Sequence, residues 1–153
     1  MKLKIKIPGI GFVLLFISLI FTLIGFGLYF RTFSIFHYLE SRITIAGTII
    51  ALWGTVFLLI NSIFSKDNPI YLNVLYLTNV FALAFAFAYF LIPCLSPIGI
   101  FFTVNMGDME TYALGVPRCI AGCVFYVLAL LSNILASFFS PSFNLKLRKK
   151  GGN

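Results

Sequence analysis

The sequence predicts an all-α integral membrane protein, an antiparallel bundle of four transmembrane helices with a long outer loop between the third and the fourth. Only 10% of its 153 residues are charged, whereas a soluble domain carries roughly a quarter. The mean hydropathy is +1.06, and Phe alone contributes 19 residues. Crossing a hydrocarbon core takes roughly 20 apolar residues. Four stretches without any charge reach that length: residues 7–30, 43–65, 68–107 and 119–145.

The first helix is predicted at about residues 8–30. Three lysines followed by an apolar run also describe a signal peptide, but no small-x-small cleavage site follows the run of 21 residues over 10–30. Pro8 stands where a helix start tolerates proline. We therefore expect a retained helix, with small and polar residues on one stripe: Gly11, Ser18, Thr22, Gly25 and Tyr29.

The second and third helices are predicted at about residues 43–64 and 71–92. Gly47, Ala51, Gly54 and Asn61 share one side of the second helix. Alanines alternate with large residues over 82–89, which has the period of a strand, but a membrane strand requires a closed barrel of similar segments. As a helix, this segment has small residues on two sides and is expected to contact two neighbours.

Residues 93–118 are predicted to form the long outer loop, because Pro93 and Pro97 interrupt the third apolar stretch. Loops of this length tend to be functional or to contain an element of their own. A short helix ending at Gly115 is expected inside it. The candidate docking residues are Asp108, Glu110, Tyr112 and Arg118.

The fourth helix is predicted at about residues 117–140, followed by a basic cytoplasmic tail at 141–153, within a single domain of residues 1–153. Its small and polar stripe faces away from a side rich in Val, Leu and Phe. This separation predicts a protein face and a lipid face. The stripe consists of Gly122, Tyr126, Ala129, Asn133, Ala136 and Ser140.

The distribution of cations predicts both termini in the cytoplasm, with the plasma membrane as the expected location. Three cations, Arg31, Arg42 and Arg118, fall on the opposite side. The basic termini are expected to attract anionic lipid, and we do not expect nucleic acid as a partner. The eight cations on the side of the termini are Lys2, Lys4, Lys6, Lys66, Lys146, Arg148, Lys149 and Lys150.

Asparagines within the predicted helices have two interpretations. An amide without a partner is costly in a membrane, so these residues either hold helices together or line a path for a solute. We favour helix packing, because no helix interior contains an ionisable residue of the kind that ion-coupled transport uses. The packing or path-lining candidates are Asn61, Asn79, Asn133, Tyr126, Gly25, Gly54 and Gly122.

The chain has three cysteines. Cys119 and Cys123 are four apart on one predicted helix and are poorly placed to bridge each other. Cys94 and Cys119 flank the predicted outer loop, so a disulfide between them is a hypothesis, against the alternative that all three are small packing residues. No C-x-x-C redox motif is present.

No sequence motif indicates a catalytic residue, a metal site or a cofactor, and His37 is the only histidine. The expected function is structural or interaction work, as a small subunit or accessory protein of a membrane complex. Other membrane subunits or further copies of the chain are the expected partners. The alternative is a small transporter or channel component acting as an oligomer. An enzyme, acting through the cysteines or a lipid site, ranks third.

Overall fold

In a computed structural model, the described part of the chain contains four helices and one short pair of strands. The structure describes residues 7–36, 42–64, 69–103, 109–139 and 142–143. The helices are α1 (Ile10–Phe33), α2 (Arg42–Phe64), α3 (Pro69–Thr103) and α4 (Met109–Phe138). In this part of the chain, all four are long and apolar enough to cross a membrane. The coarse fold prediction is therefore confirmed: the protein is all-helical, with four candidate membrane spans.

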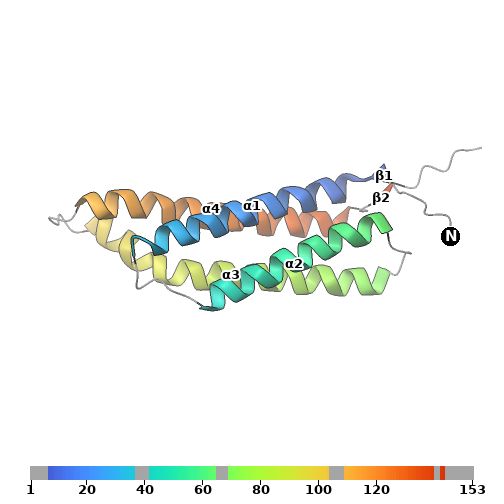
Figure 1. Cartoon of the computed structure of the whole chain (residues 1–153), viewed down its shortest axis with the longest axis horizontal. Helices are drawn as coiled ribbons and strands as arrows, with labels where there is room; N and C mark the ends of the chain where they lie inside the picture. Colours follow the sequence, from blue (N-terminus) through green and yellow to red (C-terminus); the bar gives the residue numbers. More distant parts are fainter. Residues whose placement is uncertain (1–6, 37–41, 65–68, 104–108, 140–141, 144–153) are drawn as a thin grey trace, which may run out of the picture.

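Each helix packs mainly against two others. The α1 helix lies against α4 and α2, while α3 lies against α2 and α4, so the four helices close into a ring (Figure 1). The prediction that the third helix has neighbours on two sides agrees with this arrangement. Ala82 and Ala86 of α3 lie against Gly47 of α2, as expected where close approach of backbones favours packing and lipid supplies no hydrophobic force.

The two ends of the described chain meet at one end of the bundle. The β1 strand (Ile7–Pro8) pairs with the β2 strand (Ser142–Phe143) in antiparallel register, with Ile7 opposite Phe143. Figure 1 shows this pair beyond the start of α1 and the end of α4. The segment before α1 is therefore hydrogen-bonded to the segment that follows α4.

The prediction of a long loop over residues 93–118 is wrong in extent. The α3 helix continues through Pro93 and Pro97 to Thr103, and Pro117 lies inside α4. A proline removes only one helical N–H, and lipid favours continuation of the helix because every other backbone group still needs a partner. Near the connection between them, α3 and α4 reach farther than the adjoining ends of α1 and α2 (Figure 1).

Candidate functional site

The small and polar stripes of α1 and α4 lie inside the bundle. Every predicted member of the α1 stripe is buried, and so is every predicted member of the α4 stripe within the described residues. The opposite face of α4 exposes large aliphatic residues, including Leu131 and Leu135. The Oγ of Ser18 donates a hydrogen bond to the carbonyl of Ala129 at 2.9 Å, which joins α1 to α4. The division predicted between a protein face and an outward apolar face is thus present.

Tyr126 contacts all three of the other helices from its position on α4. Its ring lies over Gly25 of α1, where an added Cβ would be 3.2 Å from Tyr126 Cδ2. The same ring packs against Phe90 of α3, with centroids 5.7 Å apart. Its hydroxyl lies 2.8 Å from the Oγ1 of Thr48 on α2. Because the Thr48 hydroxyl already donates to the carbonyl of Thr44 at 2.7 Å, Tyr126 is the donor in this bond.

Gly122 provides the space for the aromatic side chain of Phe90. A Cβ on Gly122 would lie 2.7 Å from Phe90 Cε1, which is closer than side chains approach one another. Phe90 also packs edge-on against Tyr29 of α1, at a centroid distance of 5.8 Å. Gly25 and Gly122 therefore receive the rings of Tyr126 and Phe90, and the three helices α1, α3 and α4 meet around these two rings.

Asn79 joins α3 to α2. Its Nδ2 donates to the Oγ1 of Thr55 at 2.9 Å, and Thr55 in turn donates to the carbonyl of Ala51. The Oδ1 of Asn79 packs directly on Gly54, in the space that a Cβ would need. Hydrogen bonds between helices contribute about 0.6–2 kcal/mol in membrane proteins. A glycine of the neighbouring helix thus covers the amide, and its Oδ1 has no hydrogen-bond partner among the described residues.

The other two candidate asparagines behave differently from Asn79. Asn61 donates to the carbonyl of Phe57 on its own helix, so this bond holds no neighbour. Asn133 is fully buried, with a side-chain exposure of 0%. Neither of its amide atoms has a hydrogen-bond partner among the residues that the structure describes. Asn133 is thus a buried amide that forms no hydrogen bond with the described parts of the surrounding helices.

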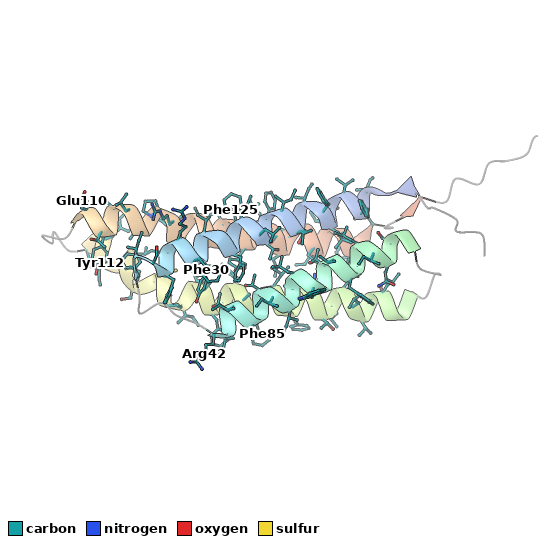
Figure 2. The ribbon with its side chains drawn as sticks, viewed as in Figure 1. Phe30, Arg42, Phe85, Glu110, Tyr112 and Phe125 are labelled. Carbon is teal, nitrogen blue, oxygen red and sulfur yellow. The ribbon has the colours of Figure 1, made fainter. Side chains whose placement is uncertain are left out.

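Three of the four predicted docking residues, Glu110, Tyr112 and Arg118, lie in the first part of α4. Figure 2 shows Glu110 and Tyr112 at the end of the bundle where α4 begins. Glu110 is exposed and Arg118 is partly buried, while the ring of Tyr112 packs on Phe36 at 5.5 Å. Phe36 also occupies the space beside Gly115. Tyr112 therefore packs within the chain, and the fourth predicted docking residue, Asp108, lies outside the described residues.

All three cysteines of the chain gather between α3 and α4. The side chain of Cys94 on α3 lies near those of Cys119 and Cys123 on α4. Cys94 and Cys119 are buried in the same core cluster, and Cys123 is partly buried against it. They are free thiols in this structure. No group of three or more His, Cys, Asp or Glu residues in the described ranges is arranged to hold a metal ion.

Two grooves open on the outer surface of the bundle. One, of about 330 Å³, lies between α2 and α3, with Trp53 on its wall and Gly54 and Asn79 among its lining residues. Trp53 is 72% exposed, although it stands at the middle of α2. The other groove, of about 300 Å³, lies between α3 and α4 and includes Asn73 and Tyr76.

Comparison with known protein families, curated proteins and solved structures gives no match.

Sequence reasoning missed two features of this region. The prediction placed Cys94 in a loop, so the clustering of three thiols was not expected. A third helix that continued through Pro93 would have placed Cys94 beside the start of α4. Trp53 does not share the side of α2 that carries Gly47, Ala51 and Gly54, so the pattern of small residues does not single it out. Its position at the middle of an apolar segment was the available signal, since tryptophan is normally enriched at the membrane interface.

The space at Gly122 gives a direct test of the packing. Gly122→Ala should lower the free energy of unfolding by about 1–3 kcal/mol, because the new methyl group forces Phe90 to move. Gly27→Ala is the matched control, since nothing lies within 4 Å of an added Cβ there. Unfolding measured in mixed micelles should show Gly27→Ala unchanged or stabilised. Equal effects of the two substitutions would contradict the packing described for Phe90.

Proposed function

We propose that the chain is a structural or interaction subunit of a membrane complex and that it docks a neighbouring transmembrane helix through its α2/α3 face. One observation carries this proposal: an exposed tryptophan stands beside a groove at the middle of a membrane span. Hydrocarbon cannot pair the indole N–H. A partner helix with a hydrogen-bond acceptor would pair it and fill the groove, whereas the interior contacts of the bundle leave little for a partner to add.

The proposed topology is an antiparallel bundle in the plasma membrane, with both termini in the cytoplasm. Contacts between α1 and α4 support the antiparallel arrangement, since Ser18 meets Ala129 while the later Gly25 meets the earlier Tyr126. An even number of crossings agrees with the pairing of β1 and β2 at one end. The excess of cations at the termini supports the cytoplasmic side and an attraction to anionic lipid. A reporter fused after residue 153 that proves active only outside the cytoplasm would overturn this orientation.

The docking residues proposed from the sequence take a smaller part in this account. Glu110 is exposed at the tip of α4, but Tyr112 packs on Phe36 within the same chain. Arg42 lies at the start of α2 and points away from the bundle (Figure 2). We therefore place the main contact on the α2/α3 groove and leave Glu110 as a contact at the end of the bundle.

Trp53→Ala tests the docking face. Chains purified in mild detergent should retain a second membrane protein or a second copy, identified by mass spectrometry. Truncating an anchoring tryptophan should reduce the retained partner about tenfold or more. Phe16→Ala is the control, because Phe16 is an exposed aromatic of α1 outside the groove. A wild-type chain that runs as a lone monomer, or equal losses in both variants, would contradict the proposal.

The rival function, a small transporter or channel component, has one observation in its favour. The amide of Asn133 is fully buried and lacks a hydrogen-bond partner among the described side chains and backbone. A residue that binds a passing polar solute would have such a free amide when no solute is bound. In the structural account this amide is a cost of about 1–3 kcal/mol to the fold. The two functions therefore differ in what removing the amide does.

Asn133→Leu separates the two functions. The structural account predicts that the variant is more stable by about 1–3 kcal/mol, because an unpaired amide is replaced by an apolar group of similar size. Asn61→Leu, a partly exposed position bonded to its own helix, should change stability by no more than about 0.5 kcal/mol. Unfolding in mixed micelles and efflux of small polar solutes from proteoliposomes give the two readouts. A flux that disappears in Asn133→Leu alone would favour the transporter, and lower stability of that variant would contradict the description of its amide as unpaired.

A further inference from the structure

The chain has three cysteines, and they come from two helices, α3 and α4. Cys94 lies on α3, while Cys119 and Cys123 lie one helical turn apart on α4. Residues four apart on a helix carry parallel Cα–Cβ bonds and cannot readily form a disulfide with each other. Cys94 faces both. It is therefore the shared partner of any bridge that forms here.

Three prolines stand beside this cluster. Pro93 and Pro97 flank Cys94, and Pro117 precedes Cys119 by two residues. Each proline removes one hydrogen bond from its helix and loosens the turn in which it stands. A disulfide needs a Cα separation of about 4.4–6.8 Å. Both helices therefore have proline next to a fully buried thiol, at a point where a helix bends most readily.

We propose that Cys94, Cys119 and Cys123 form a reversible disulfide-exchange site that links α3 to α4. In the first step, the thiols of Cys94 and Cys119 form an S–S bond, and their two electrons and two protons pass to an oxidant. In the second, the sulfur of Cys123 attacks that of Cys94, the bond to Cys119 breaks, and Cys119 takes up the proton that Cys123 loses. One disulfide is conserved through this exchange.

The burial of the cluster selects the kind of oxidant. Cys94 and Cys119 are fully buried among apolar residues, and charged molecules such as oxidised glutathione do not enter a hydrocarbon interior. The oxidant is therefore an uncharged, membrane-soluble two-electron acceptor. Cys123 is only partly buried, so exchange to the Cys94–Cys123 bridge releases the Cys119 thiol and brings the bridge to the more accessible position.

Oxidation by diamide, an uncharged azo compound, tests the site. Diamide takes up two electrons and two protons and becomes the hydrazine. The full chain in detergent is oxidised, unfolded and treated with N-ethylmaleimide, and its mass then counts the free thiols. We expect three modified thiols before oxidation and one after it in the wild-type chain, which has three cysteines. Three modified thiols after oxidation, or a bridge between two chains, would overturn the proposal.

Serine variants assign the partners. After oxidation, Cys119→Ser and Cys123→Ser should each retain no free thiol, because Cys94 bridges to the cysteine that is left. Cys94→Ser should keep both of its thiols free, and oxidation of this variant within one chain would contradict the role of Cys94 as shared partner. Tandem mass spectrometry of the wild-type chain should find both bridges, since fragmentation between Cys119 and Cys123 separates them. A single bridge that never exchanges would exclude the second step. Size-exclusion profiles and helical circular dichroism must match the wild type for each variant.

Discussion

The contact of Tyr126 with three other helices is the constraint on which the rest of the bundle depends. From α4 the side chain lies over Gly25 of α1, packs on Phe90 of α3 and donates a hydrogen bond to Thr48 of α2. Each contact fixes the position of a different helix relative to α4. Lipid is as apolar as the side chains, so burial alone does not draw the helices together. A large side chain with a polar end supplies both dispersion contacts and a directional bond at the point where the four helices meet.

The glycines and small hydroxyl residues follow from this central contact. Rings the size of Tyr126 and Phe90 fit between helices only where the facing residue lacks a side chain, as at Gly25 and Gly122. Between α2 and α3, Asn79 uses Gly54 in the same way and adds a bond to Thr55. Because these contacts occupy the interior, the features that remain for other molecules lie on the outer surface, as the Trp53 groove does, or in the cluster of thiols. The function that we propose uses the surface, and the exchange site uses the cluster.

The sequence predicted those parts of the structure that depend on one helix at a time. A stripe such as Ser18, Thr22 and Gly25 recurs with the helical period, so its burial follows from position alone. Partners across helices depend on rotation and depth, which periodicity does not specify, and the bond from Asn79 to Thr55 could not be assigned in advance. The loop over residues 93–118 was mispredicted because proline breaks helices in water, where free backbone groups are solvated, but is tolerated within an apolar bundle. That error also separated Cys94 from Cys119 and Cys123.

A double-mutant cycle between Tyr126 and Thr48 tests the central contact most directly. The free energies of unfolding of Tyr126→Phe, Thr48→Val and the double variant would be measured by the same reversible unfolding assay in lipid bicelles. If the hydrogen bond joins α4 to α2 as described, the two substitutions should be coupled by about 0.5–1.5 kcal/mol, because either one alone removes the same interaction. Strictly additive effects, with no coupling between the two positions, would contradict the role of Tyr126 as the residue that unites the bundle.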